Sequence, residues 1–206
     1  TRDVNAGDLE AWQELVYDAC TGCGRCDMIC PMGINISRLI NVVRQGLAEA
    51  GFMPIELRAL QEEQQEHGTV FGVGTRELNE LVDRLRADGV DIPLDRDNAE
   101  FLLLTTAAEV LLFPDTLAAN AKILNKAGVD WTLRSDAFEA ANLGLISGDE
   151  ATQRAASKRI VDAAAKAGAK TVVVPESGHA YQALRWEAAN EVDAALPFEV
   201  VAMTEF

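Results

Sequence analysis

Apolar residues recur at helical spacing through the first part of the chain. One stripe leads into a group of cysteines and consists of Leu9, Trp12, Leu15 and Val16. A second stripe follows the cysteines and consists of Ile36, Leu39, Ile40, Val43 and Leu47. We expect Asn35 to cap this second helix and Thr75 to cap a later helix that carries Leu78, Leu81, Val82 and Leu85. Between these two, a Glu- and Gln-rich segment predicts a helix that ends at His67-Gly68.

After Ile92-Pro93, short apolar runs alternate with helical segments. The runs predict strands at 101–104, 129–133, 171–174 and 198–202, and helices are predicted at about 115–127, 150–167 and 180–192. The run 109–113 fits either a short strand or the first turn of the next helix. Strands that alternate with long helices pair in parallel through right-handed crossovers. The pattern therefore predicts an α/β chain, with a helical domain over 1–94 and a small open, mostly parallel α/β domain over 95–206.

Composition and charge narrow the possible partners. The 206 residues are 49% hydrophobic, which is enough to bury a core, and the formal net charge is −15. Such a charge repels phosphate backbones and anionic lipids, so we expect no nucleic acid partner. We also expect no direct membrane span, because no apolar run reaches the roughly 18 to 20 residues that cross a bilayer. A signal peptide pattern is missing, and we expect a cytoplasmic protein.

The cysteines form one compact motif. Cys20, Cys23, Cys26 and Cys30, followed by Pro31, have the spacing C-x2-C-x2-C-x3-C-P that wraps an iron-sulfur cubane. The intervening glycines permit the tight backbone turns that such wrapping needs. Structural zinc is the main alternative, but zinc sites usually join two C-x2-C pairs across a longer loop. A disulfide framework would link distant segments, whereas these four cysteines lie within eleven residues.

The role of the fourth cysteine leaves two possibilities. In two-cluster ferredoxins the last cysteine of such a run ligates the other cluster, and this chain has no second run. Either all four cysteines hold one cluster or a partner completes the ligand set. We favour a single [4Fe-4S] cluster per chain, bound by Cys20, Cys23, Cys26 and Cys30, because this needs no further assumption.

The chain resembles the iron-sulfur subunits related to the C and D subunits of heterodisulfide reductase and the DsrK-like proteins. Nearly the whole chain is covered, and the resemblance is carried by Ala19–Cys26, Cys30–Gly33, Gly128–Trp131 and Pro175–Tyr181. It implies that the α/β region corresponds to a CCG domain, which in the family can hold a second cluster and sometimes acts at disulfides. The family also usually carries a second cysteine-rich domain, so we expect this chain to be an N-terminal portion or a shortened relative.

The α/β region departs from the family pattern at its strand ends. Where cysteines are expected, the sequence reads Thr105-Thr106-Ala107-Ala108, Ala141-Asn142 and Glu176-Ser177. None of these residues ligates iron through sulfur. The resemblance therefore implies a CCG-like domain without its cysteines.

His179 is the candidate for chemistry in the α/β half. It follows a predicted strand at the carboxyl edge of the sheet, where open sheets bind ligands. A histidine at such a turn is also commonly a hydrogen-bonded structural residue, and both interpretations stay open. Glu176, Ser177 and Tyr181 are nearby polar candidates, although Ser177 also fits a helix cap. The three tryptophans are expected to serve as core or interface anchors, namely Trp12, Trp131 and Trp186.

These features predict an electron-transfer subunit of an oxidoreductase complex rather than a self-contained catalyst. Electrons would pass between a flavin or ferredoxin-type partner and a downstream acceptor, for example a membrane quinone-linked one. The expected partners are other redox subunits, either a flavoprotein or a membrane cytochrome or quinone-reactive subunit, and such a partner could hold the cytoplasmic chain at the membrane surface. One alternative is a disulfide reductase-like catalytic subunit with a site near His179. Another is a structural zinc-binding assembly module.

Overall fold

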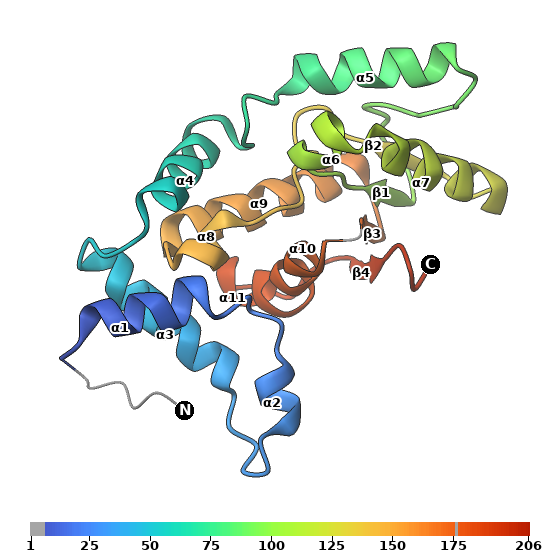
Figure 1. The fold of residues 1–206 in the computed structure, drawn as a ribbon. Helices are drawn as coiled ribbons and strands as arrows, with labels where there is room; N and C mark the ends of the chain where they lie inside the picture. The colour runs from blue at the N-terminus through green and yellow to red at the C-terminus, as the bar shows by residue number, and fades with distance from the viewer. Residues whose placement is uncertain (1–6, 176) are drawn as a thin grey trace.

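The computed structural model describes residues 7–175 and 177–206 (Figure 1). The N-terminal part contains α1 (Leu9–Gln13), the π-helical turn η1 (Glu14–Asp18), α2 (Arg25–Ile29), α3 (Ile36–Glu49), α4 (Ile55–His67) and α5 (Thr75–Ala87). The following part contains β1 (Phe101–Leu103), α6 (Ala107–Leu112), α7 (Pro114–Ala127), β2 (Trp131–Leu133), α8 (Leu143–Ser147) and α9 (Glu150–Ala167). The last part contains β3 (Thr171–Val174), α10 (Gly178–Gln182), the π-helical turn η2 (Ala183–Glu187), α11 (Ala188–Glu191) and β4 (Glu199–Ala202).

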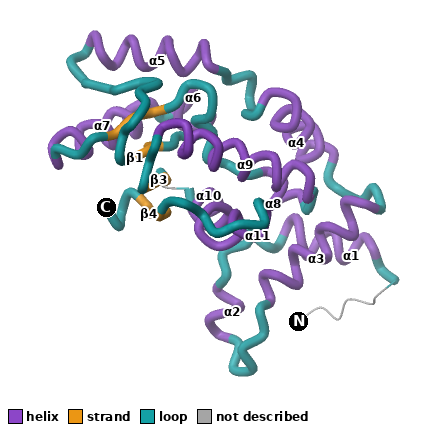
Figure 2. The backbone as a smooth tube through the Cα atoms, turned by 180° about the vertical axis from the view of Figure 1, so that it is seen from behind, coloured by secondary structure: helices purple, strands orange, loops and turns teal. Residues whose placement is uncertain are grey.

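The four strands form one parallel sheet in the order β2-β1-β3-β4. Successive side chains point to opposite faces, so each strand contributes to two cores. Leu103 and Val173 pack with α5, α6 and α7 on one face, while Leu102 and Val172 pack with α9 and α10 on the other. This arrangement confirms the predicted open, parallel α/β sheet. The structure adds that helices cover both of its faces, as can be followed in Figures 1 and 2.

Helix boundaries confirm most of the sequence expectations and correct one. Asn35 caps α3, since its side-chain oxygen accepts from the Arg38 N–H at 2.8 Å. The prediction that Thr75 caps α5 is wrong, because Thr75 is the first helical residue and its hydroxyl donates to the Ser135 carbonyl at 2.9 Å. The ambiguous run 109–113 belongs mainly to the separate helix α6.

The core on the α5 side of the sheet joins residues from both sides of the predicted domain boundary. Leu78 and Leu81 of α5 lie in the same buried cluster as Leu103 and Trp131. A parallel bridge also pairs Leu94 with Leu133 of β2. The division at 94/95 stays a prediction, and this shared core gives a direct way to test it.

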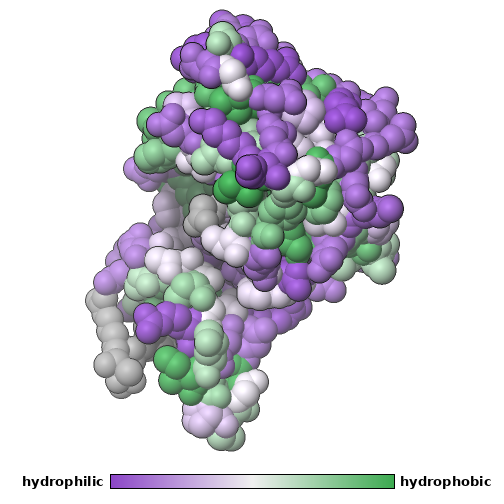
Figure 3. Space-filling model, turned by 90° about the vertical axis from the view of Figure 1, so that its right-hand side faces the viewer, coloured by the Kyte–Doolittle hydropathy of each residue, from purple (hydrophilic) through white to green (hydrophobic). Residues whose placement is uncertain are grey.

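The segment of α2 and the loop after it projects from the remainder of the chain (Figures 1 and 2). It carries exposed apolar side chains, among them Met28, Ile29 and Met32 with exposed fractions of 87%, 73% and 79%. In Figure 3 a group of hydrophobic residues is visible at the lower tip of the molecule, in addition to others spread over the upper part. Among the helices of the described residues, none combines the length and the apolar character that crossing a membrane requires.

Candidate functional site

The four cysteines lie along one short segment, residues 20–30, which includes α2 and is turned by glycines; we call it the cysteine loop. Gly22 and Gly24 have φ values of +70° and +69° before α2, and Gly33 has φ +66° after it. These left-handed conformations cost glycine little. Cys23 and Cys26 are exposed, while Cys20 and Cys30 are half-buried. The loop therefore presents thiols to solvent along a short stretch of backbone.

Asp27 ties this loop to the start of α3. Its Oδ1 accepts from the Ser37 N–H at 2.9 Å, and its Oδ2 accepts from the Ser37 hydroxyl. These hydrogen bonds lower the pKa of the Asp27 carboxyl. Because Asp27 lies between Cys26 and Cys30, its contacts hold the second half of the cysteine motif against α3.

Arg44 of α3 is buried behind the first half of the motif and hydrogen-bonds its backbone. Its side chain is buried, with a residue exposure of 2%. The guanidinium Nη2 donates to the carbonyls of Val16 and Cys20 at 2.7 Å each, and Nε donates to Val16 at 2.9 Å. Burial lowers the pKa of Arg44, and the nearby Cys20 and Tyr17 groups oppose that shift.

Local groups also change the acidity of the two exposed thiols. The pKa of Cys23 is lowered, chiefly by the backbone N–H of Arg25 and then by the Thr21 side chain. The pKa of Cys26 is raised, first by desolvation and then by the negative charge of Asp27. The two exposed thiols thus differ in acidity because their immediate neighbours differ.

His179 lies against the cysteine loop rather than at a separate site. A Cβ added at Gly22 would be 3.4 Å from His179 Cε1. Burial, and to a smaller extent the positive charge of Arg44, lower the pKa of the imidazole. Its Nδ1 is buried and has no hydrogen-bond partner among the described residues. The neighbouring Ser177 caps α10, as the sequence suggested, and Glu176 lies outside the described residues.

A cavity of about 740 Å³ is lined by residues of the cysteine loop and by residues of α10 and η2. We call it the loop cavity. Cys23 and Asp27 line one wall, and His179, Tyr181 and Trp186 line the other. The rings of Tyr181 and Trp186 meet edge to face with centroids 5.9 Å apart. Its size falls in the usual range for small-molecule sites, which is about 300–1,000 Å³.

The donor set of the loop fits an iron-sulfur cluster in its chemistry. Four cysteine sulfurs are the soft ligands that such clusters use, and the left-handed glycines allow the backbone to wrap around them. Within residues 7–175 and 177–206, no three His, Cys, Asp or Glu side chains form a group that could hold a metal ion. Because all four ligands lie on one short segment, binding of a cluster would be coupled to the conformation of that segment.

Comparison with known proteins adds a second line of evidence. The chain is 24% identical over 209 residues to the D subunit of dihydromethanophenazine:CoB–CoM heterodisulfide reductase from Methanosarcina barkeri, covering 100% of this chain and 49% of that protein. It is 25% identical to the corresponding protein of Methanosarcina mazei, covering 99% of this chain and 49% of that protein. It is 26% identical to the Hdr-like menaquinol oxidoreductase iron-sulfur subunit 2 of Archaeoglobus fulgidus, covering 88% of this chain and 35% of that protein.

The chain is thus similar over most of its length to heterodisulfide reductase D subunits and to an iron-sulfur subunit of an Hdr-like menaquinol oxidoreductase. It spans about half the length of the curated heterodisulfide reductase subunits that it matches. No family model and no solved structure matches it. The matches confirm the resemblance that the cysteine motif and the later segments indicated.

The α/β half has polar contacts at the positions where the resemblance leads us to expect cysteines. The hydroxyls of Thr105 and Thr106 both contact Glu109 Oε2, at 3.0 and 3.2 Å. Nearby, buried Glu139 accepts from the Ala107 N–H at 3.0 Å, and burial raises the pKa of its carboxyl. The polar groups of these side chains have hydrogen-bond partners within the protein, and none of the side chains contains a sulfur atom that could bind iron.

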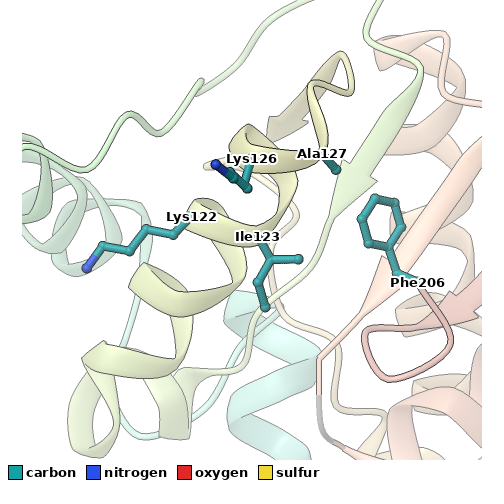
Figure 4. A pocket seen from close by; sticks show the side chains of 5 residues that line it. All are labelled: Lys122, Ile123, Lys126, Ala127 and Phe206. Atoms are coloured by element: carbon teal, nitrogen blue, oxygen red, sulfur yellow. The ribbon is translucent and has the colours of Figure 1, made fainter.

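A second hollow, of about 500 Å³, lies between α7 and the C-terminal residue (Figure 4). Phe206 faces the side of α7 that carries Ile123, and Lys122 extends away from the ring (Figure 4). This hollow is lined by two lysines and apolar groups and by no cysteine, histidine or carboxylate side chain. The loop cavity is the better candidate because it joins both sites that the sequence singled out.

Sequence reasoning missed three residues of the site: Tyr17, Asp27 and Arg44. Tyr17 donates to the Ser147 carbonyl at 2.7 Å and thereby connects η1 to the end of α8. A partial signal was available for Arg44, because it interrupts an apolar stripe at a position that helical periodicity turns inward.

Proposed function

We propose that this chain is an iron-sulfur electron-transfer subunit of a multi-subunit redox complex. Its cluster is one [4Fe-4S] centre held by Cys20, Cys23, Cys26 and Cys30. When bound, such a centre accepts and passes on single electrons. The observation that carries the proposal is the placement of all four cysteines on one glycine-turned loop, with its two halves fixed by Arg44 and Asp27.

The surroundings of the loop support electron exchange with partner proteins. The loop projects from the remainder of the chain and carries exposed apolar side chains beside exposed Cys23 and Cys26. Similar proteins are named as subunits of reductases and of a menaquinol oxidoreductase. We therefore propose a flavin or ferredoxin-type donor and a downstream, membrane quinone-linked acceptor, with the chain on the cytoplasmic side.

Anaerobic purification with iron and sulfide analysis tests the cluster. We expect about four irons and four sulfides per chain, together with the low-temperature EPR signal of a reduced cubane. Zinc without iron would support the assembly-module alternative, and about eight irons would show that a single cluster is too few.

Replacing Cys23 by Ser tests the ligand set. C23S should lose the visible absorption of the cluster and loosen the loop, because ligation and local folding are coupled. Thr21→Ser is the matched control: it alters the same loop, keeps its hydroxyl and leaves all four thiols in place. An unchanged spectrum in C23S removes Cys23 from the ligand set.

The loop cavity favours a second candidate function, reduction of a disulfide substrate beside His179. Such a reaction consumes two electrons and two protons, and an imidazole at the cavity wall is suited to move protons. The missing cysteines of the α/β half weigh against it.

Reduction of oxidised glutathione, with reduced viologen as the electron source, tests the second candidate. His179→Ala should slow the reaction and leave the EPR signal of the cluster unchanged. Ser177→Ala, which removes the cap of the same helix, controls for a merely structural effect. Wild-type protein that does not reduce the disulfide rejects this candidate and leaves the electron-transfer proposal standing.

A further inference from the structure

Arg44 is a buried cation directly behind the cysteine loop. The exposure of the residue is 2%, and its guanidinium reaches from α3 to the carbonyls of Val16 and Cys20. It also lies over the ring of Tyr17, 5.8 Å from the centroid. No ion pair joins it to a carboxylate of residues 7–175 or 177–206, whereas buried Arg134 is flanked by three aspartates.

A buried charge without a counter-charge is costly, because it gives up its hydration. Carbonyl oxygens and an aromatic face compensate only in part, since they carry partial charges. A cysteine sulfur that ligates a metal centre carries negative charge, and Arg44 already binds the carbonyl of Cys20 at 2.7 Å. A cluster held by four thiolates is itself anionic, so it would supply the missing counter-charge.

We propose that Arg44 is the electrostatic counterpart of the cysteine-ligated centre, and that its positive charge raises the reduction potential of the cluster. This inference rests on the proposed iron-sulfur function. Reduction adds one negative charge to the centre, and a nearby buried cation stabilises that added charge. Arg44 is a positioning and tuning residue, since its hydrogen bonds go to backbone carbonyls and not to a reacting atom.

Arg44 also has a purely structural role. Its guanidinium donates hydrogen bonds to the carbonyls of Val16 and Cys20, which joins η1 to the cysteine loop. Substitutions can separate the effect of the charge from the effect of these hydrogen bonds. Arg44→Lys keeps the charge and loses the fork, Arg44→Gln keeps amide donors and loses the charge, and Arg44→Met loses both.

Redox titration followed by EPR decides between the two roles. In R44M and R44Q, the ratio of reduced to oxidised cluster at a fixed potential should fall by about tenfold, which for a one-electron couple is a shift of about 59 mV to lower potential. R44K should titrate close to wild type. Arg86→Met is the matched control, because Arg86 makes the same kind of fork to the carbonyl of Ile92 on a different helix.

Equal reduction potentials in R44Q and wild type, or equal shifts in R44K and R44Q, would overturn the proposed effect of the charge. Arg44 would then serve only to hold the backbone of the cysteine loop in place. If the uncharged variants do not assemble a cluster, assembly in R44K supports the charge, and failure in R44K as well overturns it. Urea unfolding of the metal-free proteins measures the mechanical part separately. Wild-type protein without iron would instead reject the proposed function itself.

Discussion

Gly148 connects the α/β half to the helix that supports the cysteine loop. It follows α8 with φ +86°, and a Cβ at this position would lie 2.4 Å from the Arg44 carbonyl carbon and 2.6 Å from the Gln45 nitrogen. Both atoms belong to the backbone of α3, so neither can move aside cheaply. The close approach of α8 and α3 therefore depends on the missing side chain.

Gly148→Ala should destabilise the fold by about 1–3 kcal/mol, because the added methyl group overlaps backbone and the left-handed conformation is unfavourable for alanine. Urea unfolding measures the change. Gly46→Ala is the control: Gly46 lies inside α3 with nothing near its Cβ position, and alanine there should stabilise the helix by about 0.5–1 kcal/mol. A neutral effect of G148A would show that α3 and α8 do not need this contact.

At the residue scale the sequence identified the thiols and missed the groups that hold them. Spacing alone identifies the cysteine motif, since it is local in the chain. Arg44 and Tyr17 act through contacts across 24 to 130 positions, and such contacts have no local signature. Helical periodicity placed Leu39 in the buried stripe, yet Leu39 is 55% exposed. The difference arises because α3 turns its polar Arg44 side toward the loop.

At the element scale the longer helices and the strands followed from hydrophobic periodicity. α9 has the predicted bounds, and the helix predicted at 115–127 is α7 (Pro114–Ala127), which begins one residue earlier. The short elements did not follow, because α2, α6 and α8 contain only five or six residues each. Such lengths are too short for a periodic pattern, and capping groups and tertiary contacts define them.

The packing of α5 gives a test of the predicted division at 94/95. Leu78 is fully buried in the cluster that also contains Trp131, which is 2% exposed. Trp131 reports on this core by fluorescence once Trp12 and Trp186 are replaced by Phe. Leu78→Ala should lower the free energy of unfolding by about 2–5 kcal/mol and shift the transition seen by Trp131.

The control for this experiment is Leu112→Ala on α6, since Leu112 is 69% exposed. It should leave the Trp131 transition nearly unchanged. If L78A also leaves that transition in place, α5 unfolds separately from the sheet and the division at 94/95 is supported. A shift of the Trp131 unfolding transition in L78A would instead place α5 in the same cooperative unit as the sheet.

At the scale of the whole molecule, the topology unites two candidate sites that are far apart in the sequence. Cys23 and His179 are separated by more than 150 positions and line opposite walls of one cavity. Sequence analysis could place His179 at the carboxyl edge of the sheet, but it could not place the cysteine loop over that edge. That relation depends on how α3, α8 and α10 pack, which the contacts of Gly148 and Tyr17 help to fix.

The net charge of −15 leads to a prediction about electron exchange. Charges on the whole surface act over the Debye length, which is about 30 Å at 10 mM salt and about 8 Å at 150 mM. Oxidation of the reduced protein by hexaammineruthenium(III), a cation, should therefore slow as salt is raised over this range. Oxidation by ferricyanide, an anion, should become faster. Stopped-flow measurements with sodium chloride and with sodium sulfate at matched ionic strength separate screening from specific ion binding. If the two salt effects have the opposite signs, the local charge of Arg25 and Arg38 near the loop outweighs the net charge of the chain. A complementary docking face on a partner would then be acidic, whereas the expected salt effects imply a basic one.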